Sequence, residues 1–242
     1  MESYFIWNDV DSRGMGVYLR GPVTRIKPEE RVQHVTIPGR PGELTLLEGD
    51  GIYNSYIQTV SVRVKGGFRI NEVLNWLKGD GYVTFGNEPD RRQKARVIGA
   101  VTLNKLSRNL DIWVGEVQFY CSPLKEKLEA ETVTITPSAN GVLIEGDVPA
   151  RIKMTVSCTG DGSGGQMDTT ITVAGQSFTV QNNWSTTVFV ADSDAAIVTD
   201  AQGTVDWTKW STGDFPILPP GLNTFTGSGW SQIVLEKRER FL

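Results

Sequence analysis

The sequence predicts a mainly β protein, with an N-terminal β-barrel-like or sandwich-like domain that carries one short helix, followed by a β-sandwich. Apolar residues alternate with polar ones along several short segments, one segment alone has helical spacing, and the composition changes near residue 125. Residues 1–125 hold 17 Lys and Arg and 14 Asp and Glu, a net charge of +3. Residues 126–242 hold 7 and 14, a net charge of −7. We therefore expect domains over residues 1–125 and 132–242, joined by a linker over residues 126–131.

The first half contains strand-like segments before and after the helical one. Three valines in residues 59–65 alternate with polar side chains, which places them on one face of a strand. Residues 97–103 and 112–121 are expected to pair as a hairpin around a polar turn at 107–109. We expect Pro123 to end the second of these strands, because proline has no backbone N–H to donate.

One short helix is expected over about residues 72–78. Apolar residues at positions i, i+3, i+4 and i+7 form a single stripe, as in a helix that packs on a sheet. The stripe consists of Ile70, Val73, Leu74 and Leu77. We expect Leu74 and Leu77 to be buried against the sheet of the N-terminal domain.

The second half reads as many short strands separated by turn residues, which is typical of a β-sandwich. Threonine occurs 6 times before residue 126 and 17 times after it. Residues 171–173 and 178–180 alternate in the same way and are separated by Ala174-Gly175-Gln176, which predicts a hairpin.

The composition excludes several classes of protein. A membrane-spanning helix needs roughly 20 apolar residues, whereas the longest apolar runs here are four residues long, so we expect no membrane insertion. The net charge of −4 does not favour a nucleic-acid-binding protein, which usually has a basic face. Two cysteines do not make a disulfide framework, and we expect Cys121 and Cys158 to be buried thiols.

Motifs for catalysis are absent from the sequence. There is no phosphate-binding loop and no G-x-S-x-G elbow, and the one histidine, His34, lies in a strand-like segment with no obvious partner. The acidic segment 161–168 only weakly resembles a Ca²⁺ loop, because its twelfth position is Thr172. We therefore expect no enzyme activity, no metal and no cofactor.

The tryptophans of the second half offer one candidate binding site. Trp207 and Trp210 stand close together in the sequence, and exposed indole rings can stack on the apolar faces of sugars. Packing in a core or interface is the more common role of tryptophan. Sugar contact through Trp207 and Trp210 is therefore the weaker of the two interpretations.

A series of short motifs follows a fixed order along the chain. They are Phe5-Ile6-Trp7-Asn8, Gly14-Met15-Gly16-Val17, Ile37-Pro38-Gly39-Arg40-Pro41-Gly42, Asp50-Gly51-Ile52-Tyr53, the helical segment 70–79, Pro89-Asp90-Arg91, Phe119-Tyr120-Cys121-Ser122-Pro123 and Leu218-Pro219-Pro220-Gly221-Leu222-Asn223. In order and spacing they resemble the distal tail proteins (Dit family) of siphophage baseplates. The resemblance spans most of the chain and is densest over residues 5–123.

This resemblance implies a structural protein of the virion with no catalytic site and no cofactor. Members of the family form a ring, usually of six copies, between the tail tube and the tail-tip hub, near the tape-measure protein. The N-terminal domain builds the ring, and a galectin-like sandwich projects outward, where it can hold receptor-binding proteins or touch a cell-wall saccharide. The resemblance therefore places the chain at the tail tip, and in the host cytoplasm during assembly.

The turn at Pro38, Gly39, Arg40 and Gly42 is the candidate assembly interface. Glycine and proline make a stiff turn around Arg40, and the planar guanidinium of arginine suits contacts with carboxylates.

Two other classes of protein remain open: a carbohydrate-binding module that recognises the host surface, and a cell-wall hydrolase subunit. The lack of a nucleophile or metal motif argues against the hydrolase.

Overall fold

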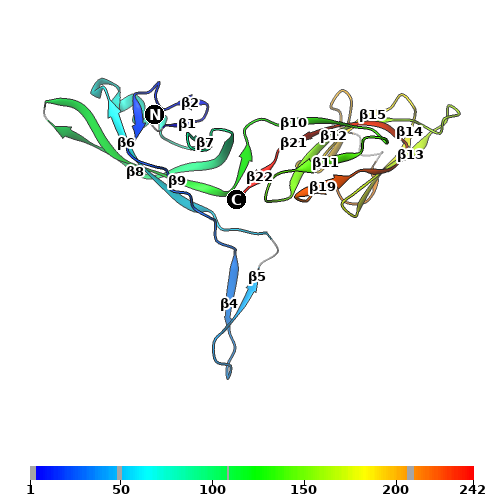
Figure 1. Cartoon of the computed structure of the whole chain (residues 1–242), viewed down its shortest axis with the longest axis horizontal. Coiled ribbons are helices and arrows are strands. Elements are labelled where there is room, and N and C mark those ends of the chain that lie inside the picture. The colour runs from blue at the N-terminus through cyan, green and yellow to red at the C-terminus, as the bar shows by residue number, and fades with distance from the viewer. Residues whose placement is uncertain (1–3, 48–50, 108, 206–209) are drawn as a thin grey trace. The chain divides into compact units, whose positions relative to one another are not determined.

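The structure, a computed structural model, describes residues 4–47, 51–107, 109–205 and 210–242. The chain divides into two compact units, Met1–Leu128 with Leu242 and Glu129–Phe241, and each is described by itself (Figure 1). The described residues are mostly in β-strands, with a single α-helix, so the predicted mainly β class is confirmed. The assignment of separate roles to two domains stays a prediction.

The first unit is built on one antiparallel sheet with the strand order β2-β1-β7-β8-β9-β6-β3. The strands are β1 (Phe5–Trp7), β2 (Val10–Asp11), β3 (Val17–Leu19), β6 (Tyr56–Lys65), β7 (Asp80–Phe85), β8 (Arg91–Ser107) and β9 (Leu110–Lys127). The three alternating valines of β6 are all buried, as predicted. The predicted hairpin is also present, because β8 pairs with β9 up to Ser107 and Leu110.

Aromatic side chains fill the core of this unit. The ring of Phe119 lies 5.6 Å from that of Phe5, 5.4 Å from that of Trp7 and 6.0 Å from that of Phe85, measured between ring centroids. All four side chains are buried. Tilted and edge-to-face pairs at such distances stabilise a core beyond the area they bury. Phe119 is therefore the centre of the aromatic cluster.

Helix α1 (Ile70–Trp76) follows the short 3-10 turn η1 (Gly67–Arg69). Val73 and Leu77 are buried, and the ring of Trp76 stacks on Phe5 at 5.6 Å. The expected burial of Leu74 is wrong, because this side chain is only half-buried. The core of the unit holds Val73 and Leu77, with Ile70 and Trp76 packed against it, so Trp76 rather than Leu74 completes the buried face of the helix.

Replacing Leu77 with Ala is expected to lower the free energy of unfolding by about 2–5 kcal/mol, the usual loss for a core leucine. Leu74→Ala should cost less, because its side chain loses less buried surface. Urea denaturation of both variants measures the difference. An equal loss for the two substitutions would contradict the packing described for α1.

Strand β9 does not stop at Pro123, contrary to prediction, but continues to Lys127. The pairing of β8 with β9 shifts register between Gln93 and Ala95, opposite residues 121–125. A bulge of this kind leaves backbone groups outside the regular ladder, which lets a strand accept a proline. The segment between β9 and β10 (Glu131–Ile135) consists only of residues 128–130, so it is shorter than the linker predicted over residues 126–131.

The second unit is a β-sandwich. One sheet has the order β10-β21-β12-β15-β16, with β18 also paired to β12, and the other has the order β17-β14-β13-β20. A separate pair is β11 (Gly141–Ile144) with β19 (Gly221–Thr224). The remaining strands are β12 (Ala150–Cys158), β13 (Met167–Val173), β14 (Gln176–Asn183), β15 (Val188–Asp192), β16 (Ile197–Asp200), β17 (Trp210–Thr212), β18 (Ile217–Leu218), β20 (Thr226–Ser228), β21 (Trp230–Lys237) and β22 (Arg240–Phe241).

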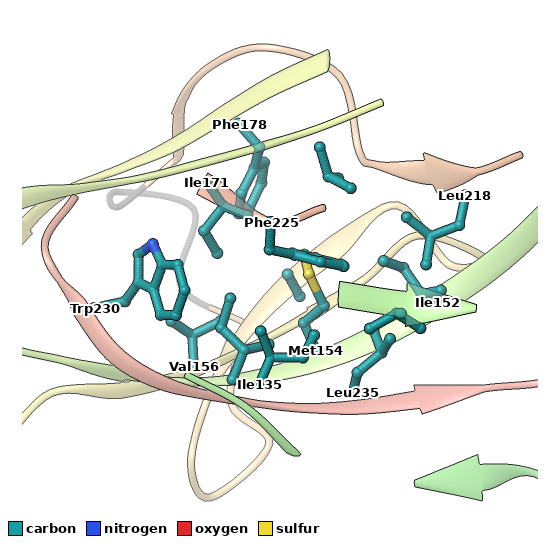
Figure 2. Close-up of a cluster of buried hydrophobic side chains, with 14 of the residues drawn as sticks. Ile135, Ile152, Met154, Val156, Ile171, Phe178, Leu218, Phe225, Trp230 and Leu235 are labelled. Atoms are coloured by element: carbon teal, nitrogen blue, oxygen red, sulfur yellow. The ribbon is translucent and has the colours of Figure 1, made fainter. Parts of the chain in front are cut away.

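Side chains from both sheets meet in the core of the sandwich (Figure 2). Met154 of β12 and Leu235 of β21 face Ile171 of β13 and Phe178 of β14. The predicted hairpin is present, because β13 turns into β14 through Ala174 and Gly175, both with positive φ (52° and 75°). Two such residues match the twist of adjacent strands.

Candidate functional site

A β-hairpin of the first unit stands apart from its sheet. Strands β4 (Val32–Thr36) and β5 (Glu43–Leu47) pair with each other and, among the described residues, with no other strand. At its base, the N–H of Arg31 donates to the carbonyl of Ile52 (2.9 Å), and the N–H of Asn54 donates to that of Glu29 (2.8 Å). Figure 1 shows the hairpin extending away from the sheet of its own unit.

Toward its tip the hairpin has one apolar and one polar face, whereas at its base the polar face also carries Val32 and Leu47, the latter 60% exposed. None of its ten strand residues is buried. Opposite partners share a face, and the apolar face consists of Val35, Leu44 and Leu46, with Gln33 beside them. Val35 and Leu46 are 39% and 44% exposed. A two-stranded ribbon is marginally stable in water at best, so this face needs a partner.

The predicted assembly residues lie together at the tip of this hairpin. Pro38, Gly39, Arg40 and Gly42 are all exposed. Gly39 and Gly42 have positive φ angles (81° and 84°), and the N–H of Arg40 donates to the carbonyl of Ile37 at 3.1 Å. Left-handed backbone of this kind favours glycine, which explains the glycines on either side of Arg40. Their role as an interface stays a prediction.

The polar face carries His34. Its Nδ1 lies 3.3 Å from Oγ1 of Thr45 and 3.7 Å from a carboxylate oxygen of Glu43. In a catalytic triad the nucleophile and the acid contact different ring nitrogens, whereas here both neighbours are on Nδ1. The imidazole is also more than half exposed. This geometry does not make His34 a general base for Thr45.

Cys121 and Cys158 are not in a disulfide, and both are buried, as predicted. Burial is the main cause that raises the pKa of Cys121 to about 12. Because the thiolate is the nucleophile, we expect the native chain to react with a disulfide reagent far more slowly at neutral pH than the chain in urea. The absorbance of the released thiol measures both rates. Equal rates would contradict the burial of the thiols.

The remaining sequence candidates are only partly covered by the structure. Trp207 lies outside the described residues, and Trp210 is described only as backbone at the start of β17. Sugar contact by this pair stays a prediction. Within the described ranges, no group of three or more His, Cys, Asp and Glu is placed to hold a metal ion. No helix in the part described has the length and apolar character needed to cross a bilayer.

The tip of the hairpin was predicted from the sequence, but its two paired strands were not. The segment that contains His34 was expected to form a strand, and Pro38, Gly39, Arg40 and Gly42 a stiff turn. The available signal was the short apolar alternation on each side of that turn, at Val35 and at Leu44 and Leu46.

Comparison with solved structures gives an end-to-end match. The crystal structure of SPP1 Dit (gp 19.1), described as "a Paradigm of Hub Adsorption Apparatus in Gram-positive Infecting Phages", matches with a TM-score of 0.75 and 17% sequence identity. The match covers 100% of both chains. This chain has the fold of SPP1 Dit. No protein-family model matches the sequence, and no curated protein matches it.

Proposed function

We propose that this chain is a structural protein of a phage tail tip that forms a ring between the tail tube and the baseplate hub. The observation that carries the proposal is the likeness in fold to SPP1 Dit, which extends over both units without a gap in coverage. SPP1 Dit is itself described as a paradigm of a hub adsorption apparatus. The ordered motifs of the sequence support the same role independently of the fold.

The hairpin gives the proposal a physical basis. Its apolar face is exposed and, in the part of the chain that the structure describes, no further strand pairs with the hairpin. In a closed ring each copy can offer one hairpin and receive another. Packing Val35 and Leu46 on a neighbouring copy would remove apolar surface from water. The hairpin is then an arm that links successive copies, and the rest of the first unit forms the body of the ring.

The finer features of the role follow from the family resemblance. The ring has six copies and contacts the tail-tube protein, the hub protein and the tape-measure protein. The second unit is a galectin-like domain that faces outward and can hold receptor-binding proteins. The protein belongs to the virion and passes through the host cytoplasm during assembly. It has no enzyme activity.

Reversing the charge at the hairpin tip tests the assembly role. The Arg40→Glu variant should keep the thermal melting temperature of the wild type, because the side chain is exposed. If the tip contacts a carboxylate of a neighbour, loss of that pair is expected to cost about 2–5 kcal/mol per contact. Complementation of a phage lacking the gene measures the yield of infectious tails.

Arg20→Glu is the matched control, since Arg20 is also exposed but lies outside the hairpin. It should complement normally. Normal tails from the Arg40→Glu variant would remove the tip from the interface. A wild-type chain that forms no ring, even with the tail-tube and hub proteins, would overturn the proposed function as a whole.

A further inference from the structure

Strands β11 (Gly141–Ile144) and β19 (Gly221–Thr224), called the ribbon below, form a two-stranded sheet of their own within the second unit. No other strand in the described ranges pairs with the ribbon. On its inner face, Val142 and Ile144 are buried in the core of the sandwich. Apolar packing has no direction, so these two side chains do not fix where the ribbon lies along its neighbours. Polar contacts of defined geometry are needed for that.

One edge of β11 has no strand beside it. The carbonyl of Asn140 accepts from the N–H of Phe225 (2.8 Å), so the even-numbered residues of this segment direct their backbone groups toward β19. The carbonyl of Leu143 and the N–H of Glu145 therefore point to the opposite edge. Backbone donors and acceptors of this kind require partners, and in a sheet the partners come from the adjacent strand.

Two buried charges occupy this edge. Lys237 is 4% exposed, and Glu239 is fully buried. Nζ of Lys237 donates to the carbonyl of Leu143 at 2.7 Å. The carboxylate of Glu239 accepts from the N–H of Glu145 at 3.1 Å. The ammonium and the carboxylate also pair with each other at 2.8 Å, so together they supply the donor and the acceptor that a neighbouring strand would supply.

Backbone pairing is found just beyond the charged pair. The N–H of Asp147 donates to the carbonyl of Arg240 at 3.0 Å. A Cβ at Gly146 would collide with the same carbonyl, so glycine lets the two segments approach each other. The charged pair therefore continues, through side chains, a contact that the backbone makes directly at Asp147.

A third charge completes the surroundings of the ammonium. Glu131, the partner of Lys237 across β10 and β21, places a carboxylate oxygen 3.2 Å from Nζ. Three acceptors thus match the three protons of the ammonium. Burial disfavours the charge, but the hydrogen bonds to Glu239 and Glu131 outweigh burial and raise the pKa of Lys237 above its usual value. The lysine is therefore charged at neutral pH.

We propose that Lys237 and Glu239 form a clasp that fixes the position of the ribbon by standing in for a missing strand. A buried ion pair adds little to overall stability, because the loss of water offsets the attraction between the charges. Its directional hydrogen bonds instead select one register, which is the best-attested role of buried polar groups. The clasp goes beyond ring assembly, which does not require it.

Hydrogen exchange read by mass spectrometry on the full chain tests the clasp. The variant Lys237→Met with Glu239→Leu removes both charges but keeps apolar volume, so the sandwich should fold with a similar melting temperature. Peptides that cover the ribbon should exchange at least about tenfold faster than in the wild type, because the ribbon opens locally. Amides of β12 and β15 should keep their rates.

Arg151→Met with Asp194→Asn is the matched control, since it removes an exposed pair of opposite charges (3.0 Å) from the same unit. It should leave exchange in the ribbon unchanged. Glu239→Gln is a milder variant, because glutamine keeps an acceptor oxygen and loses only the charge. Its ribbon should also exchange faster than in the wild type while β12 does not, which keeps the test available if the charge-free variant does not fold.

Two results overturn the proposal. One is a ribbon that exchanges at the wild-type rate in these variants, since the clasp would then not hold it. The other is an equal acceleration in the ribbon and in β12, because the charges would then stabilise the whole sandwich rather than place the ribbon. Ring assembly is scored separately at the hairpin, so either proposal can fail without the other.

Discussion

A chain carrying Val35→Lys and Leu46→Lys is expected to fold normally but to fail to assemble. Both side chains are exposed in the isolated chain, so the substitutions remove little native packing. In a ring, each buried Val or Leu contributes about 1.5–3 kcal/mol, and two lysines would also have to lose water at every contact. We therefore expect a large loss of assembly. Light scattering and negative-stain microscopy with the tail-tube and hub proteins measure it.

The polar face of the same hairpin supplies the control. Thr36→Lys with Thr45→Lys adds the same charge to the same two strands but on the opposite face. This variant should assemble nearly as well as the wild type. If both double variants assemble, or if both fail, the apolar face has no special role and the hairpin is not the proposed arm.

Replacing Phe119 with Ala is expected to be the most destabilising single change in the first unit. The side chain is fully buried and its ring contacts three other aromatic rings. Loss of a buried phenylalanine costs about 3–5 kcal/mol, a large fraction of the stability of a small domain. Urea denaturation followed by near-UV circular dichroism measures the change, because that signal reports aromatic packing.

Tyr120→Ala is the neighbouring control. Tyr120 lies next to Phe119 on β9 but points to the other face and is 47% exposed. Its loss should cost less than about 1 kcal/mol, as for most surface changes. A comparable loss for the two variants would mean that the aromatic cluster does not hold the sheet together.

The parts of the fold that depend on local patterns could be predicted from the sequence. Alternation along β6 and the turn between β13 and β14 are set by neighbouring residues, and both are confirmed. The prediction that strand β9 ends at Pro123 was wrong because local sequence rules do not detect a bulge that depends on the partner strand. The exposure of Leu74 was missed because sequence spacing does not show which side of the apolar stripe faces the core, where Trp76 packs instead.

The candidate sites show the same division. The turn around Arg40 could be found from its glycines and prolines, whereas the hairpin was missed, because the apolar alternation on each side of that turn is short. Trp207 and Trp210 were chosen because they stand close together in the sequence, whereas the structure shows that Trp184 is 47% exposed. The exposure of a tryptophan is decided by tertiary packing, and sequence spacing carries little information about it.

A cryo-electron microscopy reconstruction of the assembled tail tip tests the central claim most directly. The account predicts a closed ring of this chain between the tail tube and the hub, with the β4–β5 hairpin of each copy lying on the next copy. Val35, Leu44 and Leu46 should then be buried in the contact between copies. A ring in which these three side chains remain in solvent would contradict the role of the hairpin. The absence of this chain from the tail tip would contradict the proposed function itself.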